Sequence, residues 1–100
     1  LVYARSDRVC EIQVEEICKS RASEWHHRKD RQQLGTWHAS NGLDACPPCH
    51  RYVTTERTVA KRYGWAVEPW LTPAEVPVLR RGEWVRLDDS GGFSPAEEAA

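Results

Sequence analysis

The stretch that decides the fold occupies residues 24–50 and reads EWHHRKDRQQLGTWHASNGLDACPPCH. It contains the adjacent histidines His26 and His27, an Asn-Gly pair that begins at Asn41, and a Cys-Pro-Pro-Cys-His run that ends at His50. Imidazole and thiolate side chains bind transition metals, and imidazole also transfers protons near neutral pH. The density of these groups in a chain of 100 residues is its main functional signal.

The first half of this stretch predicts a short strand and then a long loop. Residues 23–28 alternate in polarity, which is typical of a strand, and the alternation sends His26 and His27 to opposite faces. Residues 29–42 are polar and contain two glycines, so we expect a loop of about 14 residues. A loop of this length in a small domain usually has a function or is disordered.

The second half predicts a returning strand and a helix. Residues 43–45 are expected to form the second strand, and the Pro-Pro pair directly after Cys46 favours the first turn of a helix. The Thr-Thr pair at residues 54–55 is expected to end this helix, because hydroxyl side chains compete for backbone partners. A second helical segment over residues 56–63 would end at Gly64. The central unit is therefore strand, loop, strand and helix.

Shorter elements are expected on both sides of this unit. Residues 1–9 look extended, and residues 65–67 suggest one further strand. The sequence Thr-Pro-Ala-Glu at residues 72–75 has the form of a helix capping box. Residues 76–79 and 83–87 have the pattern of a hairpin, whose aromatic and aliphatic side chains should pack against the central unit.

These elements predict one α+β domain over residues 1–87, with its core over residues 8–63. The composition of residues 88–100 is dominated by Gly, Ser, Ala and Glu and predicts a flexible C-terminal tail. No apolar run approaches the roughly 20 residues of a membrane span. The chain begins with Leu1 rather than Met, which suggests a processed N-terminus and leaves a removed leader open. Its first residues do not resemble a signal peptide, and a cytoplasmic location is expected.

Charge is distributed unevenly along the chain. The net charge of −1, taken alone, argues against nucleic-acid binding. Residues 19–37, however, carry five basic and two acidic side chains, and residues 50–63 carry four basic and one acidic. Residues 66–100 carry three basic and seven acidic side chains. Positive charge thus collects around the histidines, where it would attract phosphate, and a mixed solvated surface is the alternative interpretation.

Four cysteines follow the pattern C-x7-C-x27-C-x2-C and are candidate zinc ligands. Cys46 and Cys49 have the turn spacing that lets two sulfurs share one ion, whereas Cys10 and Cys18 are spaced more widely than in a standard knuckle. A structural zinc would contribute on the order of 10 kcal/mol, which suits a chain with a small core. Two disulfides or a redox pair are the alternatives. Haem attachment also fits the Cys-x-x-Cys-His run, but the chain has no Met to serve as a distal ligand.

Together these motifs resemble the HNH endonuclease family, especially its small phage-encoded members. The resemblance is carried by Trp25-His26-His27-Arg28-Lys29, by Ser40-Asn41-Gly42-Leu43 and by Cys46-x-x-Cys49-His50. It covers residues 8–55 well and residues 64–87 more loosely. It implies a ββα-metal (His-Me finger) core with a C-terminal hairpin extension, and hydrolysis of phosphodiester bonds. In members that contain cysteines it also implies a structural Zn²⁺ on four thiolates, here Cys10, Cys18, Cys46 and Cys49.

By position, the resemblance also implies roles for four other side chains. His26 and His50 would hold a catalytic divalent metal, and His27 would be the general base that deprotonates the attacking water. Asn41 would tether the long loop and orient that base. Many family members have Asp where His26 stands, so the candidate metals are Mg²⁺, Mn²⁺, Ni²⁺ and Zn²⁺, of which His favours the softer ions.

The chemistry also suits these residue types in their own right. An ion held by imidazoles acts as a Lewis acid at a phosphate, and a neutral His accepts a proton near pH 7. DNA is the expected partner, cut or nicked with low sequence specificity, with phosphate contacts from Arg28, Lys29 and Arg31. No membrane partner is expected. Phage packaging machinery is a further candidate partner, in the cytoplasm of a bacterial host. The alternative function is a non-catalytic zinc-binding module that binds nucleic acid or a protein.

Overall fold

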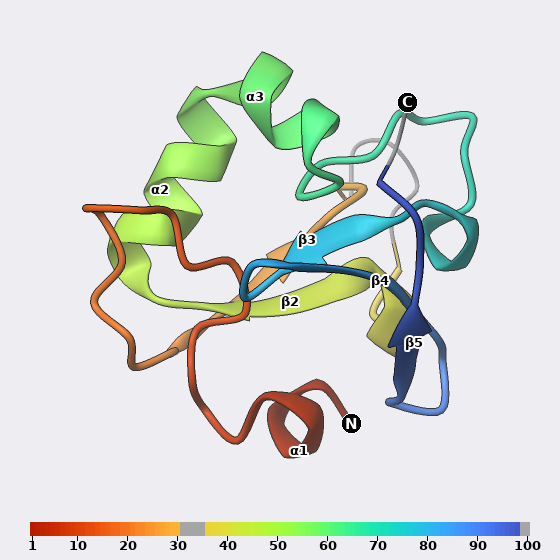
Figure 1. Cartoon of the computed structure of the whole chain (residues 1–100), viewed down its shortest axis with the longest axis horizontal. Coiled ribbons are helices and arrows are strands. Elements are labelled where there is room, and N and C mark those ends of the chain that lie inside the picture. The colour runs from red at the N-terminus through yellow and green to blue at the C-terminus, as the bar shows by residue number, and fades with distance from the viewer. Residues whose placement is uncertain (31–35, 99–100) are drawn as a thin grey trace.

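A computed structural model describes residues 1–30 and 36–98 of the chain. Over these residues the chain forms a small α+β fold with two antiparallel sheets and a few short helices, as Figure 1 shows. The α+β class predicted from the sequence is confirmed. No helix in the described ranges is long and apolar enough to cross a membrane.

The central unit has the predicted order. Strand β1 (Glu24–His27) pairs antiparallel with β2 (Gly42–Ala45), and α2 (Pro47–Thr55) follows β2 directly. The register sets His26 opposite Leu43 and His27 opposite Gly42, so the two histidines lie on opposite faces, as alternation predicts. The side chain of Cys46 caps α2 by accepting a hydrogen bond from the Cys49 N–H.

The long connection between these strands ends in a short 3-10 turn, η2 (Ala39–Asn41). The middle of the predicted loop, residues 31–35, lies outside the described residues. After α2 the helix breaks at Glu56, as the Thr-Thr pair predicts, and α3 (Arg57–Arg62) begins. Gly64 follows α3 with φ of 76°, and a Cβ there would meet the Pro77 carbonyl oxygen at 2.1 Å. Glycine is therefore required at this helix end for both its conformation and its size.

The second sheet has the order β3-β4-β5. Strands β3 (Val78–Arg80) and β4 (Glu83–Leu87) form the predicted hairpin, and the 3-10 turn η3 (Pro73–Glu75) precedes them. The turn at η3 was predicted, but no side-chain cap bond forms there. In Figure 1 the second sheet lies across the central unit, with α2 and α3 on one side of the molecule and α1 below.

The expectation of an unstructured tail from residue 88 is wrong for its first half. Strand β5 (Phe93–Pro95) pairs antiparallel with β4 and completes the second sheet. The side chain of Asp88 closes the turn before it, because its Oδ1 accepts hydrogen bonds of 2.9 Å from the backbone N–H groups of Ser90 and Gly92. A composition rich in Gly and Ser predicts little side-chain burial, but β5 is held by backbone pairing and remains exposed.

Two other local predictions are also wrong. Residues 1–9 contain a short helix, α1 (Val2–Ser6), which buries Val2 and Ser6 on one face and ends at Asp7 with φ of 53°. Residues 65–67 form no strand and instead follow α3 as a buried bend, in which the Val67 N–H bonds to the Arg28 carbonyl at 2.9 Å. In both cases contacts with distant segments decide the local structure, which is invisible to a short window of sequence.

The apolar core joins both sheets to α2 and α3. Its fully buried members come from β2, α2, α3, the second sheet and the segments beside them, and they are Cys10, Ile12, Leu43, Ala45, Cys46, Cys49, Val53, Ala60, Ala66, Val78 and Leu87. Beside it, the buried carboxylate of Glu11 accepts hydrogen bonds of 2.7 Å from Arg5 and 2.6 Å from Arg80. Burial alone would raise the pKa of Glu11, but the hydrogen bonds and charge of Arg5 outweigh it and lower the pKa. This ionised network fastens α1 to β3.

Candidate metal centre and imidazole cleft

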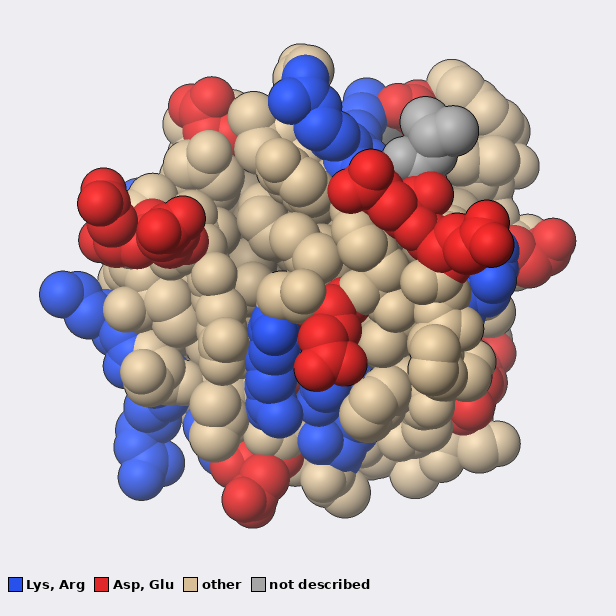
Figure 2. All heavy atoms as spheres, in the orientation of Figure 1, with Lys and Arg blue, Asp and Glu red and all other residues tan. Residues whose placement is uncertain are grey.

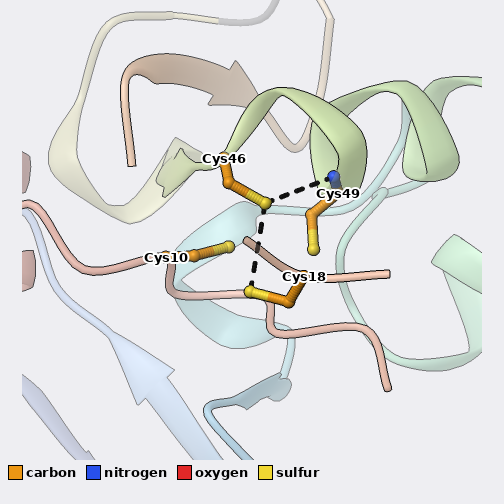
Figure 3. A group of neighbouring side chains, drawn as sticks. All are labelled: Cys10, Cys18, Cys46 and Cys49. Atoms are coloured by element: carbon orange, nitrogen blue, oxygen red, sulfur yellow. Dashed lines mark hydrogen bonds between the residues drawn. The ribbon is translucent and has the colours of Figure 1, made fainter. Parts of the chain in front are cut away.

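The four cysteines converge from segments far apart in the sequence, as Figure 3 shows. Cys10 and Cys18 lie on the irregular segment before β1, whereas Cys46 caps α2 and Cys49 lies in its first turn. Their four Sγ atoms all lie within 4.8 Å of one another, and all four cysteines are free. We call this group the thiolate cluster. Three of its members are buried, and Cys18 is partly exposed.

The geometry of the thiolate cluster fits one tetrahedral ion. Zinc–sulfur bonds of about 2.3 Å place the sulfurs of a tetrahedral site about 3.8 Å apart, and the Sγ atoms of Cys18 and Cys46 lie 3.9 Å apart. Backbone N–H groups donate to two of the sulfurs. The N–H of Val14 lies 3.3 Å from Sγ of Cys49, and the N–H of Lys19 lies 3.4 Å from Sγ of Cys46. These donors stabilise negative charge on sulfur and orient the ligands, as partners of metal-bound thiolates do.

The electrostatics of the thiolate cluster also favour a cation. Burial raises the pKa of the Cys10 and Cys49 thiols, so without positive charge they would stay protonated at neutral pH. Burial also acts to raise the pKa of Cys46, but the hydrogen bonds from the N–H groups of Lys19 and Cys49 outweigh it, so the pKa of Cys46 is lowered. A bound dication allows all four to ionise together. The four side chains predicted as zinc ligands are thus brought together at a site compatible with a structural metal ion such as zinc.

A second group of polar side chains lines an open cleft of about 440 Å³ beside β1 and α2. We call it the imidazole cleft, and it is lined by Trp25, His26, His27, Asp30, His50, Thr54 and Arg57. All three histidines that the sequence singled out border this one cleft. They come from both faces of β1 and from the first turns of α2, which the pairing of β1 with β2 sets beside each other.

His26 is held in a single orientation at the base of the cleft. It is 2% exposed, and its Nε2 lies 2.6 Å from the carbonyl oxygen of Trp65. A carbonyl can only accept, so Nε2 carries the hydrogen and Nδ1 has the lone pair. Burial, helped by neighbouring positive charge, lowers the pKa of His26 to about 3, so the ring is neutral at pH 7. A neutral, oriented imidazole is the form that binds a metal.

His50 is oriented in the same way by a carboxylate. Its Nδ1 lies 2.8 Å from Oε1 of Glu24, so Nδ1 is the donor and Nε2 is left for a ligand. The rings of His26 and His50 have centroids 5.2 Å apart. Two imidazoles bound to one ion through bonds of about 2.1 Å have centroids about 5 Å apart. Metal-binding histidines usually donate their other N–H to a carbonyl or carboxylate, and both rings do so here.

His27 lies on the opposite face of β1 among aromatic rings. Its ring centroid is 4.6 Å from that of Trp25 and 4.3 Å from that of Trp37. Gly42, the cross-strand neighbour of His27, has ordinary extended φ, but a Cβ there would lie 2.2 Å from the Trp25 ring. Glycine is therefore needed at this position for space, and the Asn-Gly pair does more than make a turn.

Asn41 fastens the two ends of the long loop. Its Oδ1 accepts from the Lys29 N–H at 2.8 Å, and its Nδ2 donates to the carbonyl oxygens of Lys29 and Thr36 at 2.9 Å. Its own carbonyl accepts from the Arg28 N–H at 2.8 Å. The buried side chain of Asn41 thus ties the backbone just after His27 to the far end of the loop. Its role in orienting His27 stays a prediction.

The phosphate contact predicted for Arg28 is wrong. Its side chain is fully buried, and its guanidinium donates to four backbone carbonyls, those of Ser40, Gly64, Pro73 and Val76. It therefore cross-links the loop to the segment between α3 and β3 and cannot reach a ligand. Lys29 is only partly exposed and its Nζ bonds to the Leu71 carbonyl at 3.3 Å. Arg31 lies outside the described residues.

Sequence reasoning missed three residues of the imidazole cleft or its border. Glu24 orients His50, and Arg57 brings a guanidinium into the cleft lining, where no carboxylate partner occurs among the described residues. Trp37 packs its ring against His27 while remaining 61% exposed. The basic character of residues 50–63 pointed to this region without singling out Arg57, and no local pattern marks Glu24 or Trp37. Only the alternation of Glu24 with His26 along a strand could have suggested that both face the same helix.

Comparisons with protein-family models, with curated proteins and with solved structures find no match to this chain. The function must therefore be argued from the two sites themselves. The thiolate cluster is closed, with four protein ligands, whereas the imidazole cleft offers two oriented nitrogen donors beside a third histidine and an arginine. Structural and catalytic metal sites differ in this same respect, because a catalytic site keeps positions open for water and substrate.

Proposed function

We propose that the chain is a metal-dependent endonuclease of the HNH type that hydrolyses DNA phosphodiester bonds. In this proposal β1, β2 and α2 form a ββα-metal core, and the thiolate cluster holds a structural zinc beside it. One observation carries the proposal. The ring centroids of His26 and His50 lie 5.2 Å apart in a cleft that His27 also lines. One nitrogen of each ring is bonded to a fixed acceptor, the Trp65 carbonyl for His26 and the Glu24 carboxylate for His50.

The residues present fit a catalytic divalent cation. His26 through Nδ1 and His50 through Nε2 would hold it, and Glu24 and the Trp65 carbonyl would fix the two rings. When bound, such an ion supplies Lewis-acid stabilisation of the charge on the scissile phosphate and the leaving oxygen. Two protein ligands leave most of its coordination positions for water and phosphate, as phosphodiester hydrolysis requires.

The remaining steps belong to the protein itself. His27 accepts the proton of the water whose oxygen attacks phosphorus, and the bond from phosphorus to O3′ breaks as the new bond forms. The guanidinium of Arg57 lies in the same cleft and can neutralise a non-bridging phosphate oxygen. Trp25 and Trp37 pack on the ring of His27 and restrict its motion. Asn41 holds the backbone after His27 in place.

The test is conversion of supercoiled plasmid to nicked and linear forms with added Mg²⁺, Mn²⁺, Ni²⁺ or Zn²⁺. We expect metal-dependent cutting by the wild type and a loss of about 10²–10⁴-fold in His27→Ala, the usual contribution of a general base. His38→Ala is the matched control, because His38 is exposed and does not line the cleft. It should cut within about twofold of the wild type. Zinc content and thermal melting confirm that each variant is folded.

The alternative is a non-catalytic zinc module that binds nucleic acid or a protein. The closed thiolate cluster favours it, because four cysteines leave a tetrahedral ion no catalytic position. This function predicts one metal per chain and no cutting with any cation. The nuclease predicts a second ion that is lost in His26→Ala and His50→Ala while the zinc remains. Equal cutting by wild type and His27→Ala would remove His27 from the proposed role.

A further inference from the structure

We propose that the imidazole cleft takes single-stranded DNA, and that the exposed face of Trp37 stacks on a nucleobase next to the phosphate in the cleft. This inference rests on the proposed nuclease function, because it names the substrate class of the same site. It is carried by the placement of Trp37, by the inaccessibility of base faces inside a duplex, and by the scarcity of basic side chains in the cleft lining.

Trp37 is both exposed and held in place. Its side chain is 61% exposed, yet its ring centroid lies 4.3 Å from that of His27 and 4.8 Å from that of Trp25. Other tryptophans differ: Trp65 is 5% exposed and belongs to the core, and Trp70 is more exposed but makes no ring contact with His27 or Trp25 among the described residues. A large aromatic surface that is already ordered loses little conformational entropy when a base stacks on it.

The position of Trp37 decides which nucleotide it can meet. A ring in contact with His27 lies beside the atom that would accept the proton of the attacking water, so the bases nearest to it flank the scissile phosphate. Inside a duplex the faces of these bases are covered by neighbouring base pairs. An aromatic side chain can stack on them only in a single strand or after a base has been displaced. A fixed tryptophan at this place therefore favours an unpaired strand.

The electrostatics of the fold point the same way. Binding to a duplex usually depends on many phosphate contacts by Lys and Arg. Among the described basic side chains of residues 19–37 and 50–63, Arg28 is fully buried, and Lys61 is paired with Glu68 at 2.8 Å. Arg51 and Arg62 are exposed but do not line the cleft. Arg57 is the basic residue among those lining the cleft, and the acidic Asp30 lines it as well. On the face shown in Figure 2, basic and acidic side chains are interspersed without a broad basic area. Stacking would supply binding energy that phosphate contacts do not.

The experiment measures binding apart from cleavage. Zinc-loaded protein without added divalent metal is titrated into a fluorescein-labelled DNA oligonucleotide of 12 nucleotides (~1.2 helical turns when paired), either single-stranded or annealed to its complement. We expect the single strand to bind about tenfold tighter than the duplex. Trp37→Ala should weaken single-strand binding about tenfold, or about 1.4 kcal/mol, and change duplex binding less than about twofold. Trp37→Phe keeps an aromatic face and should lose less than about threefold.

Trp70→Ala is the matched control, because it removes an exposed tryptophan that has no ring contact with His27 or Trp25 among the described residues, and it should bind both DNAs as the wild type does. Quenching of tryptophan fluorescence by the single strand should be strong in the wild type and much reduced in Trp37→Phe, even where binding is retained. This second readout stands if Trp37→Ala folds poorly. Equal affinity of Trp37→Ala and wild type for the single strand overturns the inference, as does tighter binding of the duplex.

The two proposals fail in different ways. Cutting that depends on His27, without any preference for the single strand, would overturn the substrate class and leave the nuclease standing. Single-strand binding that depends on Trp37, without cutting by any metal, would overturn the nuclease. The chain would then be a zinc-stabilised protein that binds single-stranded DNA at this cleft, and the assignment to Trp37 would hold.

Discussion

The thiolate cluster and the imidazole cleft both gather ligand-type side chains, but they do so in opposite ways. The cluster takes four sulfurs from distant segments and surrounds them with backbone donors, so it is closed and largely buried. The cleft takes two oriented imidazoles from β1 and α2 and leaves them beside open space. Cys46 caps α2 and Cys49 lies in its first turn, while His50 of the same helix lines the cleft, so the cluster fixes the helix on which the cleft depends.

If the proposed function holds, this difference separates stability from chemistry. A closed site with four protein ligands contributes to folding, whereas a site with few protein ligands retains positions for water and substrate. Removing the cluster should therefore destroy both sites, while removing the cleft ligands should leave the cluster intact.

Loss of the structural metal should have the largest effect. Removal of zinc with a strong chelator, or Cys46→Ser, takes away a contribution on the order of 10 kcal/mol, which exceeds the stability that so small a domain can spare. We expect the far-ultraviolet circular dichroism signal and the cooperative thermal transition to be lost. His50→Ala, which alters only the cleft, should melt within a few degrees of the wild type. A chelated protein that keeps its transition would show that the cluster is not structural.

The next largest effect should come from Arg28→Met. This change leaves four backbone carbonyls without their donor inside the fold, and we expect a loss on the order of 3–5 kcal/mol of unfolding free energy in zinc-loaded protein. Lys29→Met is the neighbouring control and should change stability by less than about 0.5 kcal/mol. Urea unfolding measures both. A variant that unfolds like the wild type but binds DNA weakly would restore Arg28 to the phosphate contact predicted from the sequence.

Arg28 also shows where prediction from the sequence stops. The strand, loop, strand and helix of the central unit were predicted because their signals are local, and the spacing of the cysteines and histidines within these elements followed. Arg28 was misassigned because its burial depends on carbonyls of residues 64–76, which only the folded chain brings to it. Charge counted along a sequence does not distinguish a solvated guanidinium from a buried one.

The same reasoning explains the other differences. Trp37 and Arg57 are ordinary residues in their own segments, and their relation to His27 and His26 exists only in three dimensions. Strand β5 was missed because its partner, β4, rather than its own composition, makes it a strand. The cluster was predictable because zinc needs several thiolates around one ion, and the Cys-x-x-Cys spacing is typical of such sites. No comparable spacing marks the role of a tryptophan or an arginine.

A smaller effect, confined to the cleft, is expected from Glu24→Ala. Loss of the carboxylate frees Nδ1 of His50, so Mn²⁺ added to zinc-loaded protein should bind about 10–100-fold more weakly. Glu24→Gln keeps an acceptor and should lie between this variant and the wild type. Glu56→Ala, a change of an exposed Glu just after α2, is the control and should bind Mn²⁺ normally. Calorimetry measures the affinity, and zinc content should be unchanged throughout.

The smallest effect should come from Asp89, which joins the C-terminal segment to the loop beside the cleft. Its Oδ1 accepts from the Ser40 hydroxyl at 2.5 Å and from the Ser40 N–H at 3.1 Å. The hydrogen bond from the Ser40 hydroxyl lowers the pKa of Asp89 below its ordinary 3.8. Asp89 is exposed, so we expect Asp89→Asn to cost at most about 1 kcal/mol at pH 7. Glu97→Gln, in the same exposed segment, should cost nothing measurable.

The contribution of Asp89 to stability should decrease as the pH falls. A carboxylate with a lowered pKa in the folded state contributes stability above the pKa of the unfolded chain, and that contribution is lost as the pH falls through the folded value. The difference in unfolding free energy between wild type and Asp89→Asn should therefore be constant above about pH 5 and shrink below pH 3.8. The comparison covers the pH range in which both proteins still hold their zinc, because the chain without zinc is expected to lose its cooperative transition. Faster amide exchange at residues 39–41, with no change in zinc content, would show that the loop side of the cleft moves independently of the cluster; equal exchange in both proteins would show that Asp89 does not hold it.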